Sequence, residues 1–288
     1  MAGENRELYG KKIYFLNPQY SIHNHVIPLL RNMEYEVYIV EHYRTLKNIL
    51  RKNPYSVCFI NIDGQLSAYG WYIFADDFKD DEQLKEVTLG FISDRISAGE
   101  KEYFLKNLDL KAGIINSSGV PAKIAEKIAD ILEMNHAKGR RQYVRANCLF
   151  DKAATIFWTQ NNLLHQLKLV DISIVGAALK IDQGHFDIPE VNTVIRSATL
   201  KLGAKQFVID FVIYAVHQRG DRQLMITLFV PDTVAGFKSA IQEYIYDIMQ
   251  EEMMSQISND KPDDRPYNQL GKSIAEMVHA QEAAKKKK

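Results

Sequence analysis

The chain has 288 residues, of which 46% are hydrophobic and 25% are charged. This length predicts two domains, because single domains usually span roughly 100–200 residues. The composition is that of a globular protein and excludes global disorder. The 36 basic and 36 acidic residues cancel, which excludes binding of nucleic acid or anionic membrane through bulk positive charge.

Cysteine content and hydropathy bear on the cellular compartment. The two cysteines, Cys58 and Cys148, are too few for a disulfide framework and lie in apolar surroundings, so we expect buried thiols. No run reaches the roughly 18 uncharged apolar residues that a membrane helix needs. The first twelve residues carry charges with no hydrophobic stretch behind them, unlike a secretory signal. We therefore expect a cytoplasmic protein without a membrane span.

In chain order, the first half alternates short apolar runs with longer amphipathic ones. The expected strands span residues 13–16, 35–40, 57–62, 87–92 and 112–115. They are continuously apolar, as in strands buried on both faces of a parallel sheet. The expected helices span residues 22–33, 43–52, 65–78, 98–107 and 121–134. Five such repeats predict a (β/α)5, doubly wound α/β domain over residues 1–136.

The pattern changes after residue 136. Residues 148–231 form long β-rich runs without helical period, and turn-forming residues separate them at 160–162, 183–185, 203–205 and 217–221. This pattern predicts antiparallel β structure, as a barrel or a sandwich. From residue 232 to about 254 apolar residues recur at helical spacing, so the domain is expected to end in a helix at residue 255. Residues 256–288 are polar and end in four lysines, which predicts a flexible tail with one short amphipathic turn near 274–278.

Positive charge is concentrated at the junction of the two halves. Residues 137–145 carry Lys138, Arg140, Arg141 and Arg145 and no acid, whereas residues 1–136 and 146–255 each carry three more acidic than basic residues. A solvated linker would account for this run. Three of its four charges are arginines, however, whose planar fork suits phosphate and the O6/N7 edge of guanine. We interpret residues 137–146 as an arginine-rich arm that binds an anion.

A second motif, Asp171-x-Ser173-x-x-Gly176, ends one expected strand and begins the next. Alone, it is explained by a hairpin turn. Together, Arg141-x-x-x-Arg145 and Asp171-x-Ser173-x-x-Gly176 resemble the paired RxxxR and [D/N]xSxxG motifs of PilZ domains, which are bacterial receptors for cyclic di-GMP. The resemblance covers about residues 138–253. It departs at residues 223–229, which keep the final Phe229 of a common last-strand motif but not its glycine.

The resemblance implies a PilZ-like antiparallel β-barrel closed by a C-terminal helix, and it implies roles for the motif residues. Arg141 and Arg145 would clamp phosphate and guanine, with Arg140 as an auxiliary. Asp171 would accept hydrogen bonds from guanine N1–H and N2–H, and Ser173 would add a polar contact. Gly176 would let the turn pass close to the ligand.

The first half resembles a receiver domain of two-component signalling, a fold that normally accepts a phosphoryl group. That chemistry needs acids after the first strand to hold Mg²⁺, an acceptor Asp after the third and a Lys after the fifth. Here the first and fifth strands are followed by Asn17 and by Asn116-Ser117-Ser118, and either Asp63 or Asn61 lies near the acceptor position. Positioned charge is central to phosphoryl transfer, so we expect a pseudo-receiver that mediates interactions.

These observations combine into a cytoplasmic bacterial signalling protein without enzymatic activity, bound metal or cofactor. It would bind cyclic di-GMP and change its domain orientation and its contacts with a protein partner, with motility as a candidate process. One alternative is a nucleic-acid-binding module that uses the same arginines, which the near-neutral β half disfavours. Another is a PilZ-like interaction protein without ligand, which the intact second motif disfavours. A third is a working phosphoacceptor at Asp63. His23 and His25 lack a third ligand and are expected to be surface residues.

Overall fold

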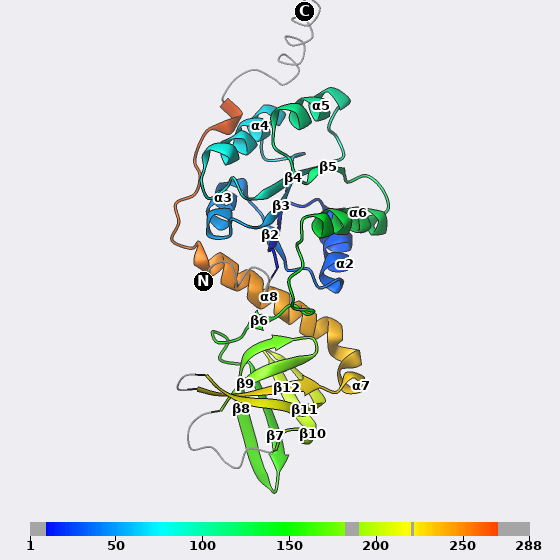
Figure 1. The fold of residues 1–288 in the computed structure, drawn as a ribbon, viewed down its shortest axis with the longest axis vertical. Coiled ribbons are helices and arrows are strands. Elements are labelled where there is room, and N and C mark those ends of the chain that lie inside the picture. The colour runs from blue at the N-terminus through cyan, green and yellow to red at the C-terminus, as the bar shows by residue number, and fades with distance from the viewer. Residues whose placement is uncertain (1–9, 182–189, 220–221, 270–288) are drawn as a thin grey trace, which may run out of the picture. The chain divides into compact units, whose positions relative to one another are not determined.

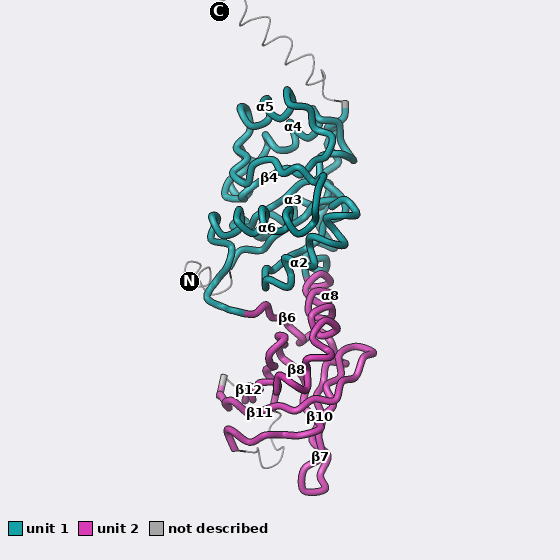
Figure 2. The backbone as a smooth tube through the Cα atoms, turned by 90° about the vertical axis from the view of Figure 1, so that its right-hand side faces the viewer, with its two compact units in different colours: residues 1–142, 253–288 teal, residues 143–252 magenta. Residues whose placement is uncertain are grey.

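A computed structural model describes residues 10–181, 190–219 and 222–269 (Figure 1). The chain divides into two compact units (Figure 2). The first consists of residues 1–142 and 253–288, and the second of residues 143–252. The chain leaves the first unit after residue 142 and returns to it at residue 253, so the second unit is an insertion in the first.

The first unit is built on a five-stranded parallel sheet in the order β2-β1-β3-β4-β5. The strands are Ile13–Leu16 (β1), Val37–Val40 (β2), Val57–Asn61 (β3), Thr88–Ser93 (β4) and Gly113–Asn116 (β5). All residues of β1, β3 and β4 are buried, because helices cover both faces of the sheet. This arrangement confirms the doubly wound, receiver-like architecture expected from the alternating pattern.

The helices of the first unit lie close to their expected positions. They are η1 Ile22–Val26, α2 Ile27–Asn32, α3 Tyr43–Lys52, α4 Ala68–Asp76, η2 Asp77–Asp80, α5 Ala98–Asn107 and α6 Pro121–Met134. One sheet face packs Phe59 and Ile92 against η1, α2 and α6. On the opposite face of the sheet, the ring of Phe91 contacts the ring of Phe104 of α5 in an edge-to-face arrangement. Ser97 begins α5 with a capping box, which satisfies amide groups that a helix end leaves unpaired.

The chain returns to the first unit at residue 253. We expected a flexible tail from residue 256, but residues 257–269, here called the C-terminal strap, pack on the first unit as far as the short helix η4 (Tyr267–Gln269). The backbone NH of Asp263 donates to the carbonyl of Arg44 at 2.8 Å, and Tyr267 is only 1% exposed. The turn expected near residues 274–278 lies outside the described residues.

The second unit is a closed antiparallel barrel. Its strands are β7 Thr155–Gln160, β8 Leu163–Ser173, β9 Gly176–Ile181, β10 Val194–Leu202, β11 Lys205–Arg219 and β12 Arg222–Phe229. They follow the order β8-β7-β10-β11-β12-β9, and pairing of β9 with β8 closes the ring. The short strand β6 (Ala146–Asn147) adds to the other edge of β8. The structure thus selects the barrel over the sandwich.

Helical residues end the second unit as expected. The segments α7 (Pro231–Val234) and η3 (Ala235–Phe237) lead into α8 (Lys238–Gln256). Within this unit Ile241 and Ile245 of α8 are buried, and the hydroxyl of Tyr244 donates to Asp151 at 2.7 Å. The turns at 161–162 and 203–204 match the expectation, whereas those at 183–185 and 217–221 lie wholly or partly outside the described residues. None of the described helices has the length and hydropathy needed to cross a bilayer.

Candidate ligand-binding site

Residues of the two sequence motifs meet where β6 pairs with β8. Arg145 directly precedes β6, and the register places Asn147 of β6 opposite Asp171 of β8. As a result Arg145 Nη1 lies 3.6 Å from Asp171 Oδ1, and the two side chains are 42% and 34% exposed. A guanidinium and a carboxylate are therefore presented together at the surface of the barrel.

A bulge in β8 explains why Asp171 faces solvent. Along β8, His165, Leu167 and Leu169 are buried while the residues between them are exposed. Unbroken alternation would place Asp171 in the core with them. Instead the pairing with β9 shifts register between Leu169 and Asp171, so Ile172 becomes the fully buried residue. Bulges of this kind commonly re-aim side chains beside functional sites.

Ser173 and Gly176 flank the tight turn that joins β8 to β9. Ser173 is only 3% exposed; its hydroxyl donates to the carbonyl of Gly176 at 3.2 Å and accepts from the NH of Val175 at 3.4 Å. These bonds are those of a side-chain-stabilised turn. In this structure the hydroxyl serves the hairpin, and the polar ligand contact expected of Ser173 stays a prediction.

Gly176 is required by packing inside the barrel wall. A Cβ atom at this position would lie 2.1 Å from the carbonyl oxygen of Thr227 on the neighbouring strand β12. The glycine thus lets β9 and β12 approach each other, and its φ angle is not in the left-handed region. The sequence suggested that this glycine lets the turn pass close to a ligand, whereas the structure shows that it lets two neighbouring strands approach each other.

The remaining arginines of the first motif belong to the other compact unit. Arg140 and Arg141 are exposed residues of the first unit, while Arg145 belongs to the second. Arg140 lines a cavity of the first unit together with Lys11 and Lys138. Within the second unit the structure therefore brings together Arg145, Asp171 and the turn after Ser173, and the ligand contacts expected of Arg140 and Arg141 stay predictions.

Comparison with solved structures finds PilZ domains among the structures to which the chain is similar. The PilZ domain with c-di-GMP of YcgR from Escherichia coli matches 42% of the chain and 98% of its own length, at 14% identity and a TM-score of 0.37. The K. pneumonia MrkH–c-di-GMP complex matches 43% of the chain and 57% of its own length, at 16% identity and a TM-score of 0.34.

The comparison with solved structures also finds a response regulator. A response regulator from Desulfuromonas acetoxidans matches 44% of the chain and 98% of its own length, at 10% identity and a TM-score of 0.35. No family model matches the sequence, and neither does any curated protein.

The receiver-like unit has a carboxylate at the expected edge of its sheet, but that carboxylate is held by neutral groups. Asp63 follows β3 and accepts hydrogen bonds from Gln19 at 2.5 Å, from the backbone NH of Asp94 at 3.0 Å, and from the hydroxyl of Ser93. Across the described ranges no three His, Cys, Asp or Glu side chains cluster as metal ligands. Asn17 replaces the acid expected after β1, and its carbonyl accepts from Asn61 at 2.8 Å.

The cysteines fit the expectation of structural thiols. Cys58 lies in β3 and Cys148 follows β6, and both are free and at most 1% exposed. Burial raises the pKa of both thiols, that of Cys148 to about 12 against the opposing effect of the Tyr244 hydroxyl. A thiol with a raised pKa is a poor nucleophile at neutral pH.

Proposed function

We propose that the PilZ-like barrel binds cyclic di-GMP and that the protein is a signalling effector of this nucleotide. The observation that carries the proposal is the exposed pair of Arg145 and Asp171, held 3.6 Å apart at the β6–β8 edge. Cyclic di-GMP presents two phosphates and two guanines. A guanidinium binds phosphate or guanine O6/N7 in a bidentate manner, and a carboxylate accepts from guanine N1–H and N2–H.

The pair is well suited to opening for a ligand. The distance of 3.6 Å and the partial exposure of both side chains describe a surface ion pair, and such pairs contribute only about 0–1 kcal/mol. A guanine that offers donors to Asp171 and a phosphate that engages Arg145 would replace this pair with charge-assisted hydrogen bonds, which are stronger. Little stability is lost when the ligand separates the two residues.

Chain connectivity supports a part for the preceding arginines. Arg141 is four residues before Arg145, and both belong to the run of four cations at residues 137–145 that contains no acid. We propose that Arg141, with Arg140 as auxiliary, closes over the nucleotide bound at Arg145. Because this segment connects the two units, closure would reorient them and alter the surface that the receiver-like unit offers to a protein partner.

Calorimetric titration of the purified chain with cyclic di-GMP and cyclic di-AMP tests this assignment. Cyclic di-GMP should bind and cyclic di-AMP should bind at least about tenfold more weakly, since adenine has no N1–H or 2-amino donor for Asp171. In an Asp171→Asn variant this preference should shrink. Equal binding of both nucleotides, or no binding, contradicts the proposal. Duplex DNA binding with a steep salt dependence would instead favour the nucleic-acid alternative.

A further inference from the structure

The C-terminal strap lies on the receiver-like unit in the manner of a bound peptide. Its sequence holds three aspartates, two prolines and one tyrosine, and residues 257–266, all described by the structure, form neither helix nor strand. The strap covers a surface of α3, α4 and η2, here called the strap site, whose contacting residues are Tyr43, Arg44, Lys47, Lys52, Phe74 and Asp77.

Tyr267 is the main apolar anchor of the strap. Among the described side chains of residues 257–268, only Ile257 and Tyr267 are buried. The Tyr267 ring contacts the rings of Tyr43 and Phe74 edge to face, with 5.9 and 5.4 Å between the ring centres. One buried aromatic side chain surrounded by more exposed polar contacts is the usual arrangement of a binding hot spot. Most of the strap can therefore leave the surface without opening the core of the unit.

The charges of the strap complement those of α3. Three cations of α3 each lie within 4.0 Å of a different strap carboxylate. The pairs are Lys52–Asp260 at 2.6 Å, Lys47–Asp263 at 4.0 Å and Arg44–Asp264 at 3.8 Å. Complementary charge across an interface selects the partner and steers its approach. The strap site is therefore suited to an acidic segment.

Two further contacts fix the position of the segment along the strap site. Arg265 of the strap lies 2.8 Å from Asp77, the first residue of η2. The side chain of Asn268 accepts a hydrogen bond from the backbone NH of Ser67, which precedes α4, at 2.7 Å. The site thus recognises an arginine and an asparagine on either side of the tyrosine, in addition to the acidic residues before it.

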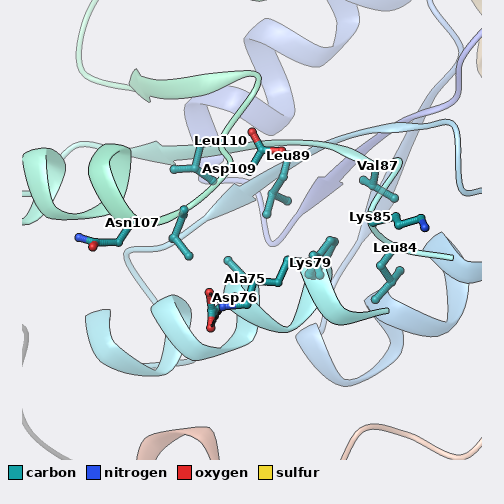
Figure 3. Close-up of a pocket in the computed structure, with 12 residues that line it drawn as sticks. Ala75, Asp76, Lys79, Leu84, Lys85, Val87, Leu89, Asn107, Asp109 and Leu110 are labelled. Carbon is teal, nitrogen blue, oxygen red and sulfur yellow. Dashed lines mark hydrogen bonds and ion pairs between the residues drawn. The ribbon is translucent and has the colours of Figure 1, made fainter. Parts of the chain in front are cut away.

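A cavity lined in part by α4 and η2 provides a contrast (Figure 3). It measures about 330 Å³, and its lining includes Lys79 and Lys85. Lys79 contacts both carboxylate oxygens of Asp76, at 2.7 and 2.8 Å, and Lys85 pairs with Glu82 at 2.5 Å. Acids three residues away in the sequence neutralise both lysines, whereas Arg44 and Lys52 of the strap site pair with acids of the strap.

We infer that the strap site is a docking surface for a partner protein and that the strap occupies it as an intramolecular competitor. The occupant that fits is an extended acidic segment in which a tyrosine follows an aspartate by four positions, as Tyr267 follows Asp263. Such a segment would displace the strap and form the same contacts. Because the strap is tethered, it competes at an effective concentration on the order of millimolar. This inference does not depend on cyclic di-GMP binding by the barrel.

A fluorescently labelled peptide of residues 257–269 tests the inference by anisotropy on the full chain. It should bind the Tyr267→Ala chain at least about tenfold more tightly than the wild-type chain, because the variant loses the anchor of its own strap. Excess peptide should raise the urea midpoint of this variant, since a ligand stabilises the folded state that binds it. Tyr267→Phe keeps the ring and should show an intermediate affinity, so the test does not depend on the alanine variant alone.

Two controls test the anchor and the charges separately. The peptide with Tyr267→Ala should not bind any of these chains. In the Tyr267→Ala chain, the further change Arg44→Gln/Lys52→Gln should weaken binding of the unaltered peptide about fivefold or more, since it removes two ion pairs. The matched control is Lys79→Gln/Lys85→Gln in the same chain, which alters the cavity of Figure 3 and should leave the affinity unchanged.

The inference is overturned if the peptide binds none of these chains at millimolar concentration, or binds the wild-type and Tyr267→Ala chains equally well. It is also overturned if the charge variant and its control bind the peptide equally well. Dimers of the wild-type chain that form with rising concentration and are lost in Tyr267→Ala would make the strap of a second copy the occupant, and would overturn the assignment to a partner protein. No arm contains cyclic di-GMP, so these outcomes are independent of the function proposed for the barrel.

Discussion

The ammonium of Lys47 donates a hydrogen bond to the hydroxyl of Tyr267, which lies 220 positions later in the chain, at 3.0 Å. Lys47 also contacts Asp77 at 2.6 Å and lies 4.2 Å from the centre of the Phe74 ring. The Tyr267 hydroxyl in turn donates to Asp263 at 2.6 Å. Through these buried contacts the C-terminal strap packs against α3 and α4, so the last described residues are part of the receiver-like unit.

Loss of the tyrosine anchor should destabilise the receiver-like unit. Tyr267→Ala removes a ring that is 1% exposed and contacts Tyr43 and Phe74 edge to face. It should lower the free energy of unfolding of this unit by about 3 kcal/mol. The control Tyr20→Ala alters a tyrosine that is 76% exposed and should cost less than about 0.5 kcal/mol. The chain has one tryptophan in each unit, so urea unfolding of a Trp158→Phe background reports on Trp71 alone. Equal stabilities of the two variants would show that the strap contributes nothing.

Stability of the same unit should rise with pH above 8. Burial lowers the pKa of Lys47 from 10.5 to about 8, although its hydrogen bond to Asp77 opposes the shift. Between these values the unfolded chain binds more protons than the folded chain, so the free energy of unfolding increases with pH. The gain from Lys47 is at most about 3 kcal/mol.

Comparison with the variant Lys47→Met separates the contribution of Lys47 to this pH dependence from those of the neighbouring Asp263, Arg265 and Tyr267. Urea unfolding at pH 8 and pH 10 should show the wild-type chain gaining stability relative to the variant. The raised pKa of Tyr267, caused first by burial and then by Asp263, acts in the opposite direction only near and above the ordinary value of 10. If the difference in free energy of unfolding between the wild-type chain and the variant stays constant from pH 8 to pH 10, then burial does not lower the pKa of Lys47 as described.

Gly176→Ala should destabilise the barrel strongly, although it adds only one methyl group. The added methyl would lie 2.1 Å from the carbonyl oxygen of Thr227. Because that oxygen belongs to the backbone of a paired strand, it cannot move aside as a flexible side chain can. We therefore expect the free energy of unfolding of the barrel to fall by about 2 kcal/mol or more. Gly236→Ala is the matched control, since nothing lies within 4 Å of a Cβ there and its φ angle is negative. Unfolding followed through Trp158 should detect the first change and not the second. If Gly176→Ala is as stable as the wild-type chain, then β9 and β12 must lie further apart than in this structure.

Acetyl phosphate with Mg²⁺ should not phosphorylate Asp63. Its oxygens accept from Gln19, Ser93 and the NH of Asp94, and the described residues supply neither a cluster of metal ligands nor a lysine directly after β5. Phosphoryl transfer depends on such positioned charge. Intact-mass spectrometry should find no phosphoryl adduct. An adduct that disappears in Asp63→Asn would restore the phosphoacceptor alternative.

The regular elements could be predicted from local pattern alone. Expected and observed helices coincide at residues 43–52, 98–107 and 121–134, because each has an apolar stripe and a recognisable start such as Ser97 or Pro121. The strap was missed for the opposite reason. Residues 257–269 are polar and contain two prolines, and their order depends on Tyr267 and Asp263 meeting Lys47 of α3. Contacts across 220 positions leave no periodic signal in the sequence.

The candidate site was predictable in part. Arg145 and Asp171 were identified by spacing, and the structure brings them together. The bulge that turns Asp171 outward could not be foreseen, since simple alternation along β8 would have buried this residue. The buried hydroxyl of Ser173 and the steric need for Gly176 likewise depend on the neighbouring strand and turn. A motif gives residue types at a spacing, and only the three-dimensional structure shows which of them remain available to a ligand.

Titration of cyclic di-GMP into the wild-type chain and into two arginine variants tests the central claim most directly. Arg145→Ala removes the guanidinium beside Asp171, whereas Arg196→Ala removes an equally charged side chain of the barrel that lies 3.7 Å from Asp210 and is 79% exposed. Calorimetry should show that cyclic di-GMP binds to the wild-type chain and to Arg196→Ala. Its affinity for Arg145→Ala should be lower by roughly 100-fold or more. Equal affinity of the two variants, or no binding to the wild-type chain, would contradict a cyclic di-GMP site at the β6–β8 edge.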